Sequence, residues 1–183
     1  LIVRWAKDNE VPLIPRAAGT SLAGQCVGEG VVVDTSKHMN QILSFDEKNK
    51  SISVQPGVIR DELNAYLKPF GLFFGPNTST ANRCTIGGMV GNNSSGTTSI
   101  RYGVTRDKVL RIRTVLSDAT VHEFGRSASS KNQSEFGQHI EQRLKSLLAP
   151  EEVGEEIRLN FPKPEIHRRN TGYAIDLLRE RLD

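Results

Sequence analysis

The sequence is poor in cysteine, in aromatic residues and in long apolar runs. It has two cysteines, Cys26 and Cys84, among 183 residues. Two thiols cannot build a disulfide framework or a four-thiolate zinc cluster, so a reducing compartment is the simplest interpretation. No apolar run exceeds three residues, as in 31–33 and 72–74. A membrane-spanning helix needs about 18 or more apolar residues, so the sequence predicts none.

The excess of positive over negative charge is also small. The net charge is +3, with 37% hydrophobic and 25% charged residues, which is the composition of a folded globular chain. Residues 1–120 hold 14 Lys and Arg against 10 Asp and Glu, whereas residues 121–183 hold 10 against 11. Twelve of the 16 glycines lie between Gly19 and Gly103. Positive charge with glycine-rich loops suits a phosphate-bearing ligand, although turns between strands also use glycine.

Several familiar site patterns are missing. The four histidines are scattered without the spacing of a metal site, so we expect no metal ion. The dinucleotide fingerprint G-x-G-x-x-G and the phosphate loop G-x-x-x-x-G-K-[ST] are both absent. A phosphate site in this chain must therefore use other loops.

The apolar pattern predicts an α+β fold. We expect helices over residues 1–9, 60–68, 135–148 and 151–159, with Gly71 placed to end the second. Strands are predicted over 13–16, 31–34, 42–45, 51–55, 109–116 and 120–124, the last two as a hairpin. Short hairpins are as common as crossovers here. The prediction is therefore two lobes with small mixed or antiparallel sheets flanked by helices, rather than a doubly wound nucleotide fold.

Two loops could hold an anion. The first, over residues 15–25, follows a predicted strand directly and has four small residues in a row. The second, over residues 84–96, has Thr85 as a predicted helix N-cap before one buried helical turn, whose positive end could face an anion. Two such loops in one domain suit a diphosphate that spans two lobes. Ordinary turns remain the alternative for each loop alone.

Both loops resemble those of a known flavoprotein family. The first reads P-R-A-A-G-T-S-L-A-G-Q, and the second reads C-T-I-G-G-M-V-G-N-N-S-S-G, followed by Arg101-Tyr102-Gly103. They are similar to the two FAD loops of the vanillyl-alcohol oxidase and para-cresol methylhydroxylase family. The most similar branch is the D-2-hydroxyacid dehydrogenases, which include D-lactate dehydrogenase, the glycolate oxidase flavoprotein subunit and D-2-hydroxyglutarate dehydrogenase. Residues 168–178 resemble the large members that carry an iron–sulfur region further on.

The resemblance implies a set of FAD contacts. Those of the first loop are Arg16, Ala17, Ala18, Gly19, Thr20, Ser21, Gly24 and Gln25. Those of the second wall are Pro76, Thr78, Ser79, Thr85, Gly87, Gly88, Gly91, Asn92, Ser95, Tyr102 and Gly103. Residues 17–21 would hold the pyrophosphate, 24–25 would lie beside the flavin, and 102–103 would close over the cofactor. No catalytic residue is predicted, because in the family these come largely from a downstream cap domain.

The sequence departs from the family loops at two points. Ala17 and Ala18 stand where the family has glycine, and an alanine at either point is strained if its φ is positive. Ala119 stands where the family has the glycine of an Asp-Gly-Thr turn. No His or Cys occupies the position that links flavin covalently in some relatives, which implies noncovalent FAD.

These implications define the expected protein. Residues 1–125 would be an FAD-binding domain, 126–134 a linker and 135–183 a helical extension. The chain starts without Met, within a predicted helix, so it is interpreted as a fragment. The intact protein would be an FAD-dependent oxidoreductase acting on a D-2-hydroxy acid, and the fragment would be inactive alone. The partners expected are that small substrate and a separate electron acceptor or iron–sulfur region, with no nucleic acid. The expected location is cytoplasmic, with peripheral attachment to the inner membrane as the alternative.

Two other functions are left open. One is a flavin reductase of the type that reduces UDP-N-acetylglucosamine enolpyruvate, which shares the fold and the FAD loops. The other is a non-enzymatic nucleotide-binding module that has lost the flavin, an alternative that Ala17 and Ala18 keep open.

Overall fold

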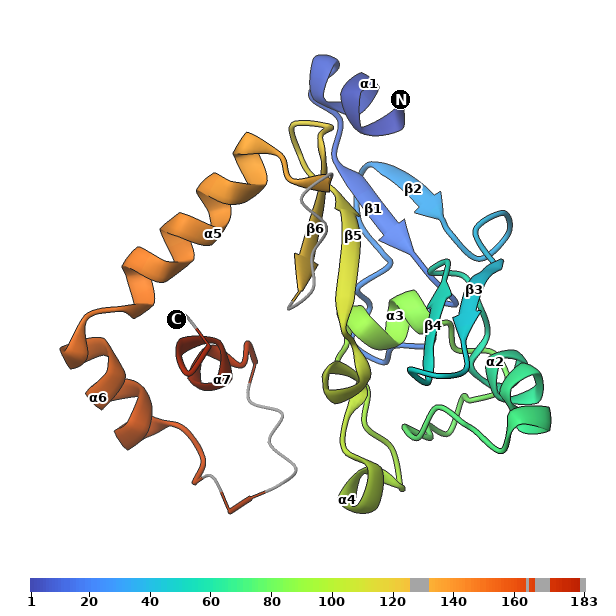
Figure 1. The fold of residues 1–183 in the computed structure, drawn as a ribbon. Coiled ribbons are helices and arrows are strands. Elements are labelled where there is room, and N and C mark those ends of the chain that lie inside the picture. The colour runs from blue at the N-terminus through green and yellow to red at the C-terminus, as the bar shows by residue number, and fades with distance from the viewer. Residues whose placement is uncertain (126–131, 164, 167–171, 182–183) are drawn as a thin grey trace. The chain divides into compact units, whose positions relative to one another are not determined.

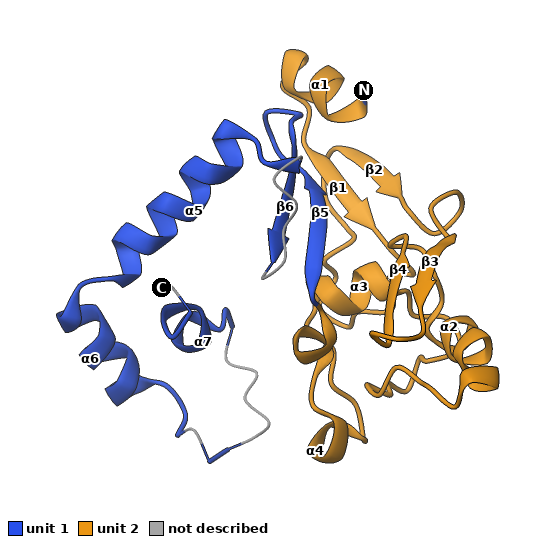
Figure 2. Cartoon of the chain, viewed as in Figure 1, with its two compact units in different colours: residues 1, 110–183 blue, residues 2–109 orange. Residues whose placement is uncertain are grey.

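A computed structural model describes residues 1–125, 132–163, 165–166 and 172–181 (Figure 1). The chain forms two compact units, residues 2–109 and residues 110–183 together with Leu1 (Figure 2). The described residues contain one parallel and two antiparallel two-stranded sheets, with helices around them. The predicted α+β class with small mixed sheets is therefore confirmed.

The first unit along the chain, residues 2–109, begins with helix α1 (Ile2–Asp8) and the only parallel strand pair among the described residues. Strand β1 (Leu13–Arg16) pairs with β2 (Val31–Asp34), in register from Leu13 opposite Val31 to Arg16 opposite Asp34. Both strands run in the same direction, so their carboxyl ends lie side by side. The first loop leaves the sheet at that edge, where open sheets commonly bind ligands.

A hairpin and a helix build the core of this unit. Strand β3 (Ile42–Asp46) pairs antiparallel with β4 (Ser51–Val54), and helix α2 (Arg60–Leu67) follows. Leu63 and Leu67, four residues apart, are buried together with Val58, and apolar residues of both strands pack against them. Each such side chain contributes about 1.5–3 kcal/mol by leaving water. The short 3₁₀ helix η1 (Lys68–Phe70) ends at Gly71, which has a φ of 68°, as the sequence predicts.

Three short elements follow in the second loop region. They are α3 (Ile86–Gly91), α4 (Ser99–Tyr102) and the 3₁₀ helix η2 (Thr105–Lys108). The sequence predicts the first of these only, because elements of four residues leave no periodic pattern to detect. Ile86 at the start of α3 packs against the α2 core, so the core holds the second loop in place.

The second unit, residues 110–183 with Leu1, contains a hairpin and three helices. Strand β5 (Arg111–Val115) pairs antiparallel with β6 (Val121–Gly125), and α5 (Glu135–Leu148), α6 (Glu151–Asn160) and α7 (Ile175–Arg179) follow. Most of the expected linker, 126–131, and part of the family-like stretch at 168–178 lie outside the described residues. Among the described residues, no helix is long and apolar enough to cross a membrane.

Candidate functional site

The first loop presents a run of free backbone amides. The N–H groups of residues 17, 18, 19 and 20 have no hydrogen-bond partner among the residues that the structure describes. They follow directly from β1, at the edge where both parallel strands end. Gly19 has a φ of 67°. Successive amides around a left-handed residue can form a concave anion site, so this loop has the donors that a phosphate requires.

A positive side chain lies beside the same amides. A Cβ built on Gly19 would stand 3.3 Å from Nε of Arg16, so the guanidinium lies against the loop. Arg16 stands opposite Asp34 in the parallel pair. The hydroxyl and amide of Ser36 hold the pKa of the Asp34 carboxyl below its ordinary value, and Arg16 lowers it further. Asp34 therefore stays ionised near neutral pH and attracts the charge of Arg16, although it cannot itself bind an anion.

The second loop differs from its prediction as an anion site. Of the first three amides of α3, Ile86 N–H donates to the Val58 carbonyl at 2.9 Å and Gly87 N–H donates to the Pro56 carbonyl at 2.8 Å. These two backbone carbonyls already occupy part of the helix end that the sequence predicts as an anion site. The longer run of free amides is therefore that of residues 17–20 in the first loop.

Thr85 occupies the predicted N-cap position without acting as a cap. Its backbone is extended, but its side chain accepts no hydrogen bond from the helix. Its Oγ1 is buried and has no partner within the described part of the chain. A buried hydroxyl normally finds a partner, so this unpaired atom is a candidate donor to a ligand.

The glycines of the second loop have two different roles. A Cβ on Gly87 would lie 2.4 Å from Cβ of Pro56, and one on Gly88 would lie 2.9 Å from Cβ of Ala17. These two glycines let protein segments approach one another, and Gly88 brings the first and second loops into contact. Gly91 is different, because a Cβ there would meet nothing within 4 Å. The fold gives no reason for a glycine at this position, which leaves room for a ligand.

A third segment, residues 74–79, adjoins the second loop. Asn77 forms a bridge with Gly96, which places the segment beside the buried Ser95. A Cβ on Gly75 would lie 2.7 Å from Cβ of Tyr102, so the predicted closing residue packs on the same segment. Thr78 Oγ1 lies 3.3 Å from Sγ of Cys84, which precedes Thr85. The structure thus places in one unit, residues 2–109, the predicted contacts Pro76, Thr78, Ser79, Thr85, Gly87, Gly88, Ser95 and Tyr102.

The far end of the first loop stands apart from this group. Ser21 and Gln25 are exposed and hydrogen-bond to each other through their side chains. Gly24 has a φ of 71° and open space where a Cβ would lie. Within the described part of the chain, no hydrogen bond joins these three to the second loop, although Gly24 is shaped for close approach. Pro56 is a site residue that the sequence analysis missed. Its ring packs against Gly87 and its carbonyl accepts from the Gly87 amide, so it contributes only ring and backbone contacts.

The arrangement can bind an elongated anionic ligand but shows no metal centre. No group of three or more His, Cys, Asp or Glu side chains that could hold a metal ion occurs in the described ranges. The donors present are backbone amides, hydroxyls and Arg16, which suit a diphosphate with neutral polar groups on both sides.

Comparison with known proteins gives matches to the site region and beyond it. A family model described as an FAD binding domain matches residues 1–125. A D-2-hydroxyglutarate dehydrogenase of Pantoea ananatis is 50% identical over 119 residues, which are 63% of this chain and 12% of the relative. The enzyme of the same name from Pseudomonas putida is 40% identical over 175 residues, which are 94% of this chain and 17% of the relative. This chain therefore spans less than a fifth of the length of either relative.

A solved structure supports the same fold. An alkyldihydroxyacetonephosphate synthase superposes with a TM-score of 0.61 at 26% identity, over 71% of this chain and 27% of that chain. The similarity therefore extends over most of the described residues.

Proposed function

Because this chain belongs to the family of FAD binding domains, we propose that residues 16–103 hold FAD noncovalently, as part of a dehydrogenase of D-2-hydroxy acids. The observation that carries this proposal is the run of four free amides at residues 17–20, beside Arg16 and in contact with the second loop through Gly88. Bound FAD would supply a hydride acceptor, which no side chain of the protein can provide.

The residues of the site fit FAD in three ways. The amides of the first loop and Arg16 would bind the diphosphate, whose two negative charges need donors that the apo fold leaves free. The open position at Gly91 would allow the cofactor to approach the backbone of α3. The buried Oγ1 of Thr85 would find in FAD the partner that it lacks. Ala17 and Ala18 do not oppose this fit, because neither has a positive φ.

The substrate class follows from the relatives. Both dehydrogenases named above act, by their names, on D-2-hydroxyglutarate, so we propose a D-2-hydroxy acid as the substrate of the intact protein. We propose that the substrate-binding and proton-transfer residues lie in the part of these longer proteins that this chain does not match. The names of these relatives favour the dehydrogenase over the flavin reductase and over a module without flavin.

The proposal also covers the domain boundaries, the electron acceptor and the location of the protein in the cell. We propose that residues 1–125 form the FAD domain, 126–134 a linker and 135–183 a helical extension. The match to the Pseudomonas putida enzyme over 94% of the chain supports the extension as part of the same protein. A separate electron acceptor or iron–sulfur region would receive the electrons. Two free cysteines fit a cytoplasmic location, with peripheral attachment to the inner membrane as the alternative.

Titration of the 183-residue chain with FAD, followed by flavin fluorescence, tests the proposal. We expect one FAD per chain, and much weaker binding of riboflavin, which lacks the diphosphate that the four amides would hold. Acid precipitation should release all of the flavin into solution. Absence of FAD binding, or equal affinity for FAD and riboflavin, would contradict the proposal, and flavin that stays on the denatured chain would contradict noncovalent attachment.

A further inference from the structure

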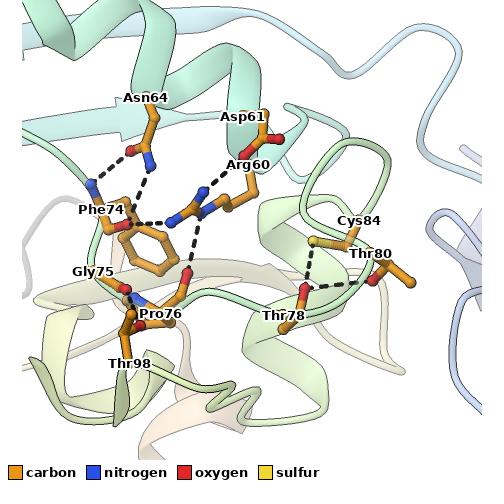
Figure 3. Close-up of polar contacts among 10 residues, drawn as sticks. All are labelled: Arg60, Asp61, Asn64, Phe74, Gly75, Pro76, Thr78, Thr80, Cys84 and Thr98. Atoms are coloured by element: carbon orange, nitrogen blue, oxygen red, sulfur yellow. Dashed lines mark hydrogen bonds and ion pairs between the residues drawn. The ribbon is translucent and has the colours of Figure 1, made fainter.

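The segment that precedes Thr78 and Ser79 is held by side chains of helix α2. Residues 72–76 form neither helix nor strand. Nevertheless, the Phe74 carbonyl accepts from Arg60 Nη2 at 3.3 Å and from Asn64 Nδ2 at 3.4 Å, and the Pro76 carbonyl accepts from Arg60 Nε at 3.1 Å (Figure 3). Asn64 Oδ1 also accepts from the Phe74 amide at 2.7 Å. Two side chains one helical turn apart therefore fix three backbone groups of an irregular segment.

The opposite side of the segment is fixed as well. The Gly75 carbonyl accepts from Oγ1 of Thr98 at 2.7 Å, and the Asn77 carbonyl accepts from the Thr97 amide at 3.1 Å. All four carbonyls from residue 74 to residue 77 thus have partners. An irregular backbone gains this degree of order only where the fold supplies specific donors, and α2 supplies those for two of the four carbonyls.

Arg60 also connects the segment to the second loop. Its backbone amide donates to the Cys84 carbonyl at 3.0 Å, and its neighbour Ile59 forms a bridge with Thr85. Its side chain is 12% exposed and makes an ion pair with the exposed Asp61 at 2.7 Å. One residue therefore sets the spacing between Thr85 in the second loop and the wall that begins at Pro76.

We propose that Arg60 and Asn64 are positioning residues for FAD, which hold the wall formed by Pro76, Thr78 and Ser79 at the correct distance from Thr85. The inference rests on the proposed FAD function. Neither side chain is assigned a contact with the cofactor. Both act through the backbone of residues 74–76, so their loss would leave the donors of the first loop in place and displace only this wall.

Arg60→Met tests the role, because methionine keeps the apolar stem and removes the three donors. We expect the dissociation constant for FAD, measured well below the melting temperature, to rise about tenfold, since two partly buried carbonyls lose a charged partner. The visible circular dichroism of bound FAD should also change, because the wall around the cofactor shifts. Arg60→Lys, which keeps the charge but only one donor group, should restore part of the affinity.

Asp61→Asn is the matched control, since it removes the exposed ion pair of Arg60 and leaves both carbonyl contacts. It should bind FAD as the wild type does. If Arg60→Met does not fold, Asn64→Ala gives the second test, with weaker FAD binding expected in a helix that favours alanine. A lower melting temperature with unchanged FAD affinity and unchanged circular dichroism would overturn the inference alone. Failure of the wild-type chain to bind FAD would overturn the proposed function and this inference with it.

Discussion

Single residues explain which substitutions in the loops matter. Ala119 lies in the turn between β5 and β6, with a φ of 67°, where its relatives' pattern has glycine. The sequence predicts strain at Ala17 and Ala18 if their φ is positive. This strain does not occur, because neither residue has a positive φ. The left-handed conformation costs about 1–2 kcal/mol for a residue with a Cβ. Among the alanines that the structure describes, the strained one is therefore Ala119.

Ala119→Gly should stabilise the chain by about 1 kcal/mol, after the entropic cost of glycine in the unfolded state is subtracted. Urea unfolding, followed by circular dichroism, measures the change. Ala17→Gly is the control, because Ala17 has no strain to relieve, and it should leave stability unchanged or slightly lower. A lower unfolding midpoint for Ala119→Gly, or a higher one for Ala17→Gly, would contradict this explanation.

Gly91 and Gly87 separate ligand binding from folding. Gly91→Val should abolish FAD binding with an almost unchanged apo melting temperature, since the added side chain enters open space that the cofactor would occupy. Gly87→Val should lower the apo melting temperature strongly, because its Cβ would overlap Pro56. Melting curves with and without excess FAD check both expectations. Ala65→Val, which places the same final side chain on the exposed face of α2, is the control for the effect of valine in a helix. Full FAD stabilisation of Gly91→Val would place the cofactor elsewhere.

At the scale of elements, the sequence predicts most helices and strands but few of their contacts. The spacing of Leu63 and Leu67 predicts the buried face of α2, and both are buried. Tyr66, three residues after Leu63, has the spacing of the same face, but it is 41% exposed and forms a ring contact with Phe45. A local sequence pattern shows which residues of a helix share one face, but it does not show which part of the protein covers that face.

The closeness of the candidate site residues depends on distant pairs. The contacts of Gly87 with Pro56 and of Asn77 with Gly96 join segments far apart in sequence, and no local pattern encodes them. The sequence could therefore identify the two loops, but not that the amides of Ile86 and Gly87 are already occupied. Nor could it show that four successive amides of the first loop stay free.

The docking of α5 on the β5–β6 hairpin depends on one glycine. His122 is fully buried, its Nδ1 accepts from the Ser134 amide at 3.0 Å, and its Nε2 lies 3.7 Å from Oε1 of Glu141. A Cβ on Gly137 would lie 2.0 Å from this Nδ1. The close approach of helix and ring therefore requires glycine at this position.

Gly137→Ala should destabilise the chain by about 1–3 kcal/mol through overpacking, although alanine favours a helix interior. Gln138→Ala, on the exposed side of the same helix, is the control and should be neutral or slightly stabilising. Chemical denaturation of both variants gives the answer. A stabilised Gly137→Ala would show that helix propensity outweighs the contact with His122.

At the scale of the whole molecule, we expect this chain to bind FAD without catalysing the oxidation of a D-2-hydroxy acid. The chain spans 12% and 17% of the length of two relatives named D-2-hydroxyglutarate dehydrogenase. We therefore expect no steady oxidation of D-2-hydroxyglutarate or D-lactate by the chain with added FAD and a dye acceptor. Dye reduction over time measures this. Turnover well above that of free FAD would show that the residues for substrate binding lie within these 183 positions.

The most direct measurement for the central claim is the response of individual backbone amides to FAD. In a ¹⁵N-labelled sample titrated with FAD, the amide resonances of residues 17–20 should show the largest shifts, because these donors are free in the apo fold. Those of Ile86 and Gly87, which already donate to Val58 and Pro56, should shift far less. Saturating FAD that leaves residues 17–20 unshifted while it perturbs Ile86 and Gly87 would contradict the account.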